Sequence, residues 1–339
     1  MISLEKINKI DLSKMYQVYD FWPDIAEVSF KENYDKIEIR NTRHIVFAGM
    51  GGSGTIGDIF HSILSKNDIH VDVVKGYHLP KTINSESVLI CTSVSGNTIE
   101  TNSILKEGIK KKCNIITFSS GGNLEKIAKN SNIEHRKILM NHSPRSSFVK
   151  YLYSMINILQ PILSISNNDI IESINGLKEV RRNISTQNLN EQNFSLNLAN
   201  WIRYNPMIYY PWGLQSAAVR FKNSIQENSK MHAFAEDIIE SCHNGIVSWE
   251  RDSSIIPILI TGEDDFIKTQ ERWKLIKEFF DEKNIDYKEV KSGKGNILTK
   301  LTRLIYILDM CSIYLAILND VNPTPVSSIT EIKNRLEKL

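Results

Sequence analysis

The 339 residues carry a formal net charge of +2, and 41% of them are hydrophobic. This length and composition suffice for two domains, each with a packed core. Lysines and acidic residues are interspersed without a basic stripe, which argues against a nucleic-acid partner. The four cysteines form no C-x-x-C pair, so we expect neither a zinc knuckle nor a disulfide framework, and a reducing cytoplasm fits the chain.

The apolar segments are too short or too interrupted to predict a membrane span. Residues 1–11 place charges where a signal peptide has an apolar core. The most apolar late stretch, 301–318, is broken by Arg303 and Asp309. We therefore expect a buried helix at this position in a soluble, cytoplasmic protein that has no membrane contact.

Short β-rich runs dominate the first half, after an N-terminal helical arm over residues 1–40. The predicted strands are 45–48, 70–74, 88–91 and 114–118, with a weaker one at 138–140. The predicted helices between them include 98–112 and 124–130. Strands that alternate with helices indicate right-handed crossovers and a mostly parallel sheet covered on both faces, so the expected fold class is α/β.

The same alternation resumes in the second half. A long helical stretch over 148–193, interrupted at Pro161 and at 164–169, separates the two halves. The elements predicted beyond it are strands at 207–211, 255–261 and 287–291, helices at 213–229, 266–282 and 298–318, and a final amphipathic helix at 328–339. The expected organisation is a first domain with its arm at 1–158, a helical linker at 159–194 and a second domain at 195–339.

Two glycine- and hydroxyl-rich loops follow predicted strands and lead into predicted helices. The first is Gly49-Met-Gly-Gly-Ser-Gly54, and the second is Ser93-Val-Ser-Gly-Asn-Thr98. Backbone N–H groups at the start of a helix donate to phosphate oxygens, and serine and threonine hydroxyls can do the same. Together the loops predict one phosphate held from two sides.

Other interpretations of these loops stay open. The glycines of the first loop satisfy G-x-G-x-x-G, with Asp68 or Asp72 near the distance where a dinucleotide-binding fold carries its ribose-binding acid. The extra hydroxyls are not needed by a pyrophosphate site, and the missing Gly-Lys-Ser/Thr excludes a Walker A loop. Turn formation alone, with Ser95 or Thr98 capping a helix, is the plainest alternative.

The order of these motifs resembles the sugar isomerase (SIS) domain family, in particular its bifunctional phosphoglucose/phosphomannose isomerase branch. Further matches are Gly57-Asp58, the extension of the second loop through Ile-Glu-Thr101, Pro144-Arg145, Glu227-Asn228, His243-Asn244 and Pro323-Thr-Pro-Val with Ile332-Lys333. The resemblance spans roughly residues 41–339. It implies two SIS domains, each with a mostly parallel five-stranded sheet flanked by helices, and a homodimer whose active site takes a residue from the partner subunit.

The resemblance implies aldose–ketose isomerisation of glucose 6-phosphate, and of mannose 6-phosphate, to fructose 6-phosphate, with no metal, nucleotide or other cofactor. The histidine pattern agrees on the metal, because none of the eight histidines lies in an H-x-x-H, H-E-x-x-H or Cys/His motif. Three other functions stay open: a non-catalytic phosphosugar-binding protein, an isomerase of another sugar phosphate and a nicotinamide dehydrogenase.

The resemblance also implies which residues form the site. The phosphate-binding positions are Gly51, Gly52, Ser53, Ser93, Ser95 and Thr98. An enediolate reaction needs a base that moves a proton between C1 and C2, a cation for the developing oxyanion and groups that open the sugar ring. The matching residues are Glu227 as the base, Arg145 as the cation, His243 as the ring-opening histidine that reaches the partner's site and Lys333 as a lysine that assists at the ring.

Each of these four side chains also has a plain structural interpretation. A surface arginine after a turn, a capping or ion-paired glutamate, a lone histidine and a solvated helical lysine are all ordinary in folded proteins. The chain also departs from the family pattern, because no Pro-Glu precedes the His243-Asn244 pair and a glycine follows it. The second half has no glycine-hydroxyl loop like the first, which predicts a single phosphate site, in the first domain.

Overall fold

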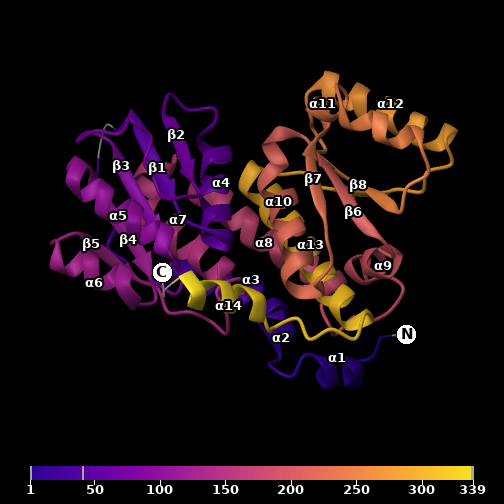
Figure 1. Cartoon of the computed structure of the whole chain (residues 1–339), viewed down its shortest axis with the longest axis horizontal. Helices are drawn as coiled ribbons and strands as arrows, with labels where there is room; N and C mark the ends of the chain where they lie inside the picture. Colours follow the sequence, from indigo (N-terminus) through magenta and orange to yellow (C-terminus); the bar gives the residue numbers. More distant parts are fainter. Residues whose placement is uncertain (1, 40–41, 337–339) are drawn as a thin grey trace.

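The computed structural model describes residues 2–39 and 42–336, and it has the expected α/β architecture with two parallel sheets. Figure 1 shows one sheet on each side of the molecule, with helices between them. The N-terminal arm lies below both sheets in this view, and its helices are α1 (Leu4–Ile10), α2 (Met15–Asp20) and α3 (Trp22–Lys31).

The first sheet has five strands in the order β2-β1-β3-β4-β5, and all neighbours pair in parallel. The strands are β1 (His44–Ala48), β2 (His70–Val74), β3 (Val88–Thr92), β4 (Asn114–Ser119) and β5 (Glu134–Lys137), with helices α4 (Gly51–Leu64), α5 (Ile99–Lys111) and α6 (Gly122–Asn130). Alternation along β1 places Ile45 and Phe47 in the main core, and Val46 and Ala48 in a smaller core on the opposite face.

The expected strand at 138–140 is wrong, because the fifth strand is β5, immediately before it. β5 is an edge strand whose residues are exposed or half-buried. Its backbone pairs with β4, and its polar side chains form no apolar pattern that the sequence could reveal. Of the expected residues, Ile138 is buried, whereas Leu139 and Met140 are exposed. The apolar run therefore marks the end of the sheet rather than a strand within it.

Helices α7 (Phe148–Leu163) and α8 (Asn167–Ile184) form the predicted helical stretch between the sheets. Pro161 lies in the last turn of α7. Ser166 begins α8 with a capping box, in which its side chain accepts from the backbone of Asp169 and the Asp169 carboxylate accepts from the backbone of Ser166. The interruption predicted at 164–169 is therefore a break between two separately capped helices.

The second sheet has four strands in the order β7-β6-β8-β9, again all parallel. Its strands are β6 (Asn205–Tyr210), β7 (Phe234–Asp237), β8 (Ile255–Thr261) and β9 (Lys288–Lys291). The helical elements around it are α9 (Phe194–Trp201), η1 (Trp212–Leu214), α10 (Gln215–Ser224), the π-helical turn η2 (Ile225–Ser229), α11 (Ile238–Ser241), η3 (Gly245–Glu250), α12 (Ile267–Glu282), α13 (Ile297–Leu318) and α14 (Ser327–Leu336).

Within the described residues the second sheet thus has one strand fewer than the resemblance implied. After α13 the chain enters Asn322-Pro-Thr-Pro325, and these prolines have no N–H to give to a sheet ladder. The expected final helix is present as α14, and its last three expected residues, 337–339, lie outside the described part of the chain.

Helix α13 is the central core element that joins the two halves. Its 22 residues are apolar enough to cross a membrane by length and composition, but 83% of its most apolar window is buried inside the protein. It packs against α8, α9 and α10, and one hydrophobic core runs from β1 to α13. Helix α13 is therefore a buried core helix of this fold.

Candidate functional site

The two glycine- and hydroxyl-rich loops lie at the carboxyl ends of neighbouring strands. The first follows β1 and the second follows β3, and these strands pair directly. The chain continues from β1 to β2 on one side of the sheet, while β3 and the later strands lie on the other side. The loops therefore flank the topological switch point, which is where ligands bind in open parallel α/β sheets.

The first loop opens helix α4 with a glycine in the left-handed region. Gly51 has a φ of +53°, a conformation that favours glycine. Ser53, in the first turn, is buried, and Gly52 lies against a cation: a Cβ added at Gly52 would lie 3.4 Å from Nη1 of Arg220. The start of α4 thus combines a helix N-terminus with a nearby guanidinium, and both favour an anion.

The second loop is held closed by its own hydroxyls and by a glycine contact. The hydroxyls of Ser93 and Thr98 lie 2.8 Å apart, and the Gly96 N–H donates to the Ser93 Oγ at 3.1 Å. Gly96 has a φ of +72°, and a Cβ there would lie 1.7 Å from the carbonyl oxygen of Gly121, so glycine alone fits. The loop is therefore a fixed shape rather than a flexible turn.

Helix capping by these hydroxyls, the plain alternative, is wrong for both residues. Thr98 is the N-cap residue of α5, but its side chain makes no capping hydrogen bond. The Ser95 Oγ accepts from the Asn97 N–H at 3.3 Å, ahead of the helix. Neither side chain is used to begin α5.

Arg145 is buried and lies beside Glu227. Its Nη1 is 3.4 Å from the Glu227 Oε2, and its Nε donates to the Asn228 Oδ1 at 2.8 Å. Its Nη2 donates to the carbonyl oxygens of Pro323 at 2.5 Å and Thr324 at 2.8 Å. The interpretation of Arg145 as a surface arginine is therefore wrong, because the C-terminal turn and the Glu227-Asn228 pair enclose it.

Glu227 lies in the π-helical turn η2, which continues α10. Its side chain is 30% exposed, so it is partly buried, and it borders a cavity of about 590 Å³. The cavity lining residues are Asn223, Gln226, Glu227, Lys230, Met231, His232, Pro325, Val326, Ser327, Ser328 and Ile329. Single π-helical turns are frequent at functional sites, and this cavity has the size of a small-molecule pocket.

Arg220, which the sequence did not single out, connects the loop to this pair. Its Nη2 donates to the carbonyl oxygen of Arg145 at 3.0 Å and to the Asp309 Oδ2 at 2.6 Å. Its guanidinium also lies 3.9 Å from the ring centroid of Phe148. A continuous series of contacts therefore runs from Gly52 through Arg220 to Arg145 and Glu227.

The sequence signal that could have pointed to a buried arginine is Asp309, the partner of Arg220. It interrupts the apolar run of α13 and is fully buried, and burial raises the pKa of its carboxyl while the charge of Arg220 lowers it. A buried carboxylate requires a cation or hydrogen-bond donors, which Arg220 and the Ser224 hydroxyl provide. The sequence showed the acid but not which arginine would meet it.

Lys230 lines the cavity and, after Arg220, is the second residue that the sequence motifs did not identify. It has a left-handed φ of 56°, and its Nζ donates to the Glu227 carbonyl oxygen at 2.6 Å. Desolvation, and next the positive charge of Arg145, lower the pKa of Lys230 to about 8. The amine of this cavity residue therefore loses its proton at a lower pH than an ordinary lysine does.

Two of the expected site residues are not brought to Glu227 within this chain. His243 is exposed just after α11, which Figure 1 places at the far end of the second sheet from α14. Lys333 is exposed on α14, about one helical turn beyond Ile329, which lines the cavity. His232, in contrast, lines the cavity directly.

A cluster of possible metal ligands lies away from this cavity. His44, His70 and Asp72 come together at the starts of β1 and β2. No local histidine motif contains these residues, because they lie on two paired strands instead of one helix. This placement also weighs against a dinucleotide site, because Asp68 precedes β2 and Asp72 lies in its middle, while a ribose-binding acid belongs at the carboxyl end.

The fold defines a protein with two parallel α/β domains and a glycine loop at the switch point of the first. Residues 191–336 match the family model described as the bacterial phospho-glucose isomerase C-terminal SIS domain.

The chain is also similar to named relatives, and it shares its fold with solved structures. The chain is 27% identical, over 99% of both chains, to the bifunctional phosphoglucose/phosphomannose isomerase of Aquifex aeolicus (strain VF5). It is 26% identical, over 74% of this chain and 78% of the other, to the D-glucosamine-6-phosphate 4-epimerase of Sulfolobus acidocaldarius. A glucose-6-phosphate isomerase like protein from Thermus thermophilus shares the fold, with a TM-score of 0.68 and 16% identity over 98% of this chain and 99% of that one.

Proposed function

We propose that this protein is an aldose–ketose isomerase that interconverts glucose 6-phosphate, and mannose 6-phosphate, with fructose 6-phosphate. The name and near-complete coverage of the Aquifex aeolicus relative support this substrate class. The observation that carries the proposal is the contact between the Arg145 guanidinium and the Glu227 carboxylate at 3.4 Å, beside a cavity. Arg220 connects this pair to the glycine loop.

In this proposal the phosphate of the sugar lies between the two loops of the first domain. The backbone around Gly51 and Gly52 and the hydroxyl of Ser53 donate from one side, and the hydroxyls of Ser93, Ser95 and Thr98 donate from the other. The positive end of the α4 dipole and the Arg220 guanidinium favour the dianion. One phosphate site in the first domain accounts for both loops.

The proposed reaction is a proton transfer between adjacent carbons. The Glu227 carboxylate removes the proton from C2 of the open-chain aldose, the C1 carbonyl oxygen becomes an enediolate oxygen, and the carboxylic acid returns the proton to C1. The O2 proton moves to O1, so that the product is the ketose and the base is regenerated. The Arg145 guanidinium stabilises the negative oxygen through its planar donors.

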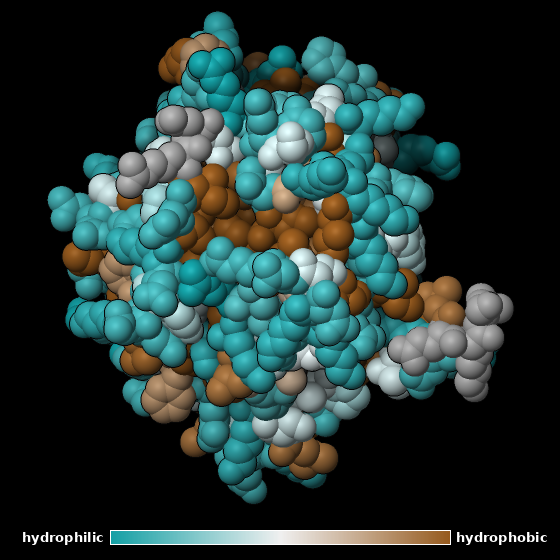
Figure 2. Space-filling model, turned by 90° about the vertical axis from the view of Figure 1, so that its left-hand side faces the viewer, coloured by the Kyte–Doolittle hydropathy of each residue, from teal (hydrophilic) through white to brown (hydrophobic). Residues whose placement is uncertain are grey.

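The ring-opening assignment requires a second copy of the chain. We infer a homodimer in which the exposed His243 opens the sugar ring in the partner's site, while Lys333 on the exposed α14 assists at the ring. Figure 2 shows an apolar hollow, rimmed by hydrophilic residues, on the face at the left of Figure 1. Such surfaces mark interfaces, so this hollow supports a dimer.

The domain organisation and location complete the proposal. The first domain with its arm is assigned to 1–158, the linker to 159–194 and the second domain to 195–339. The buried state of α13 and the separated cysteines support a cytoplasmic enzyme of carbohydrate metabolism that acts in glycolysis and gluconeogenesis.

The test is the Glu227→Gln variant. Because the amide cannot accept the C2 proton, kcat for fructose 6-phosphate is expected to fall by roughly a thousandfold or more, with phosphosugar affinity nearly unchanged. Turnover is measured by a coupled assay and affinity by calorimetry. The matched control is Glu282→Gln, at the exposed end of α12, which keeps full activity; full activity in Glu227→Gln would refute the base assignment.

A second candidate function is a reaction on another sugar phosphate. The similarity to the D-glucosamine-6-phosphate 4-epimerase of Sulfolobus acidocaldarius supports this candidate. The same cradle and base suit any sugar whose phosphate and acidic C–H lie at similar positions. A panel of hexose, amino-sugar and pentose phosphates, assayed with the same enzyme preparation, separates the two. Binding without conversion of any of them would instead support a non-catalytic phosphosugar-binding protein.

A further inference from the structure

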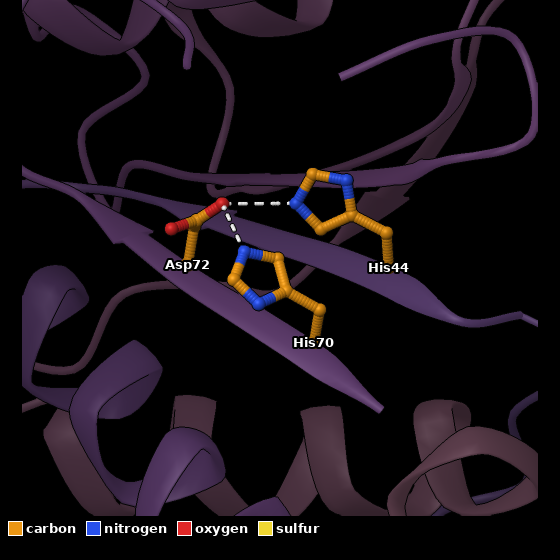
Figure 3. Close-up of side chains that lie close together, drawn as sticks. All are labelled: His44, His70 and Asp72. Atoms are coloured by element: carbon orange, nitrogen blue, oxygen red, sulfur yellow. Dashed lines mark hydrogen bonds and ion pairs between the residues drawn. The ribbon is translucent and has the colours of Figure 1, made fainter. Parts of the chain in front are cut away.

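We propose that His44, His70 and Asp72 form a binding site for a divalent ion of the Zn²⁺ type, separate from the sugar-phosphate site. Figure 3 shows the three side chains converging, with both imidazole rings directed at one carboxylate oxygen. His44 and His70 begin β1 and β2, and Asp72 lies in the middle of β2, whereas the glycine loop follows the carboxyl end of β1. The strand rise of about 3.3 Å per residue separates the two sites by more than about 10 Å.

The strand pairing sets the geometry of this cluster. His44 lies opposite His70 in the parallel register, and Asp72 lies two residues further along β2, on the same face. The Nε2 of His44 is 2.9 Å from the Asp72 Oδ2, and the Nε2 of His70 is 3.3 Å from the same atom. All three ligand atoms lie within 4.8 Å of one another. Tetrahedral Zn²⁺ needs ligand atoms about 3.3 Å apart, so only the nitrogen atoms have to move slightly.

Ser87 orients the buried histidine. The Ser87 hydroxyl accepts from the Asn84 N–H at 3.1 Å and donates to the Asn84 Oδ1 at 3.3 Å. The Ser87 hydroxyl also lies 3.1 Å from the His44 Nδ1, and this contact holds the ring with its Nε2 toward Asp72. The His44 Nε2 lies 2.9 Å from the Asp72 Oδ2. Ser87 thus occupies one ring nitrogen of His44, and the other ring nitrogen faces the carboxylate, where an ion could bind.

The donor set favours a first-row divalent metal over calcium or magnesium. Two imidazoles and one carboxylate are the ligands that Zn²⁺ and its neighbours prefer, and a hydrogen bond to the second ring nitrogen is typical of metal-bound histidine. His44 has 14% side-chain exposure, Asp72 has 31% and His70 has 63%, so an ion can enter from the side of His70. The ion would tie the edge strand β2 to β1, which is its sole partner in the described sheet.

The experiment is Zn²⁺ binding to the chelator-treated full chain at pH 7.5, measured by calorimetry and equilibrium dialysis. One ion per chain is expected, and a hundredfold excess over Kd raises Tm by roughly 5 °C. His70→Ala, at the exposed ligand, weakens binding at least tenfold, and Ser87→Ala weakens it about tenfold through the orientation of His44. The matched control is His78→Ala, an exposed histidine outside the cluster, which binds like the unchanged chain.

Three results would overturn the proposal. The first is the absence of stoichiometric binding, and the second is equal Zn²⁺ affinity of His70→Ala and His78→Ala. The third is a Tm that depends on pH but not on Zn²⁺, which would assign a proton to the cluster. The three ligands lie outside the cavity that Glu227 lines, so His70→Ala is expected to convert fructose 6-phosphate as the unchanged chain does. Failure of the Zn²⁺ proposal can therefore be distinguished from failure of the proposed isomerase function.

Discussion

The two sheets share one topology but differ in the loops at their switch points. In the first sheet the loops after β1 and β3 carry glycine and hydroxyl residues. In the second sheet β6 leads into Pro211-Trp212-Gly213, and β8 leads into Gly262-Glu-Asp-Asp265, where the Asp265 carboxylate accepts from the Gly262 N–H. A carboxylate-rich loop repels a phosphate dianion. In the proposed function the first domain therefore supplies the anion site, and the second domain supplies the reacting carboxylate through α10 and η2.

The largest expected effect tests whether the shape of the first domain's second loop is fixed. Gly96→Ala places a Cβ at 1.7 Å from the Gly121 carbonyl oxygen and requires a residue other than glycine at a φ of +72°. We expect a loss of about 3 kcal/mol or more in the free energy of unfolding, measured by urea denaturation. The control in the other domain is Gly213→Ala, where nothing lies within 4 Å of the new Cβ. Equal stability of the two variants would contradict the comparison.

The buried ion pair of Arg220 and Asp309, both in the second half of the chain, is the next test. Asp309→Ala leaves the Arg220 guanidinium buried without its carboxylate, which is expected to cost about 3–5 kcal/mol of stability in the same assay. The exposed pair of Lys268 and Glu271 gives the comparison, and Glu271→Gln is expected to change stability by less than about 1 kcal/mol. A small loss of stability in Asp309→Ala would contradict the proposal that Arg220 connects the first glycine loop to Glu227.

The phosphate cradle is tested by removing its hydroxyls. Ser53→Ala combined with Thr98→Val removes two donors to a charged oxygen, and Kd for fructose 6-phosphate is expected to rise roughly a hundredfold. The control is Ser216→Ala in the first turn of α10, which follows the second domain's first strand; its buried hydroxyl has no hydrogen-bond partner among the described residues. If affinity is unchanged in the double variant, the phosphate binds elsewhere.

The smallest expected effect concerns pH. Lys230 has a pKa lowered to about 8, so its ammonium loses its proton as pH rises through that value. Phosphosugar affinity should fall severalfold between pH 7 and 9, and Lys230→Arg should remove this dependence because guanidinium stays charged. Lys283→Arg on the surface should retain it.

The same shift has a consequence for stability, because the unfolded chain holds the Lys230 proton up to its ordinary pKa of 10.5. Between pH 8 and 10.5 the unfolded state binds more protons than the folded state, so this group makes stability rise with pH across that window. A pH-independent affinity in the unchanged chain would show that Lys230 does not face the ligand.

Local patterns predicted the first domain better than the second. Apolar runs and glycine punctuation placed β1 to β4 within one residue at each end, because these strands carry dense apolar runs. The same signals missed β7, whose Phe234–Asp237 sequence is short and polar, and missed the π-helical turn around Glu227, which interrupts an otherwise helical pattern.

The candidate site also contains residues that local motifs identified and residues that they missed. Motif order identified the two loops, Arg145 and Glu227, and the structure brings them into one connected region. Arg220, Lys230 and the His44-His70-Asp72 cluster could not be found, because their partners come from other strands or helices and no local spacing records such contacts. The proposed role of His243 depends on a second subunit, which a single chain's pattern does not contain, and Lys333 lies on the exposed helix α14.

The most direct measurement is a crystal structure of the protein with fructose 6-phosphate. The account predicts the phosphate within hydrogen-bonding distance of the Ser53 and Thr98 hydroxyls, and the Glu227 carboxylate within about 3.5 Å of C1 and C2. A phosphate bound at the loops of the second sheet, or a sugar whose reacting carbons lie beyond the reach of Glu227, would contradict it.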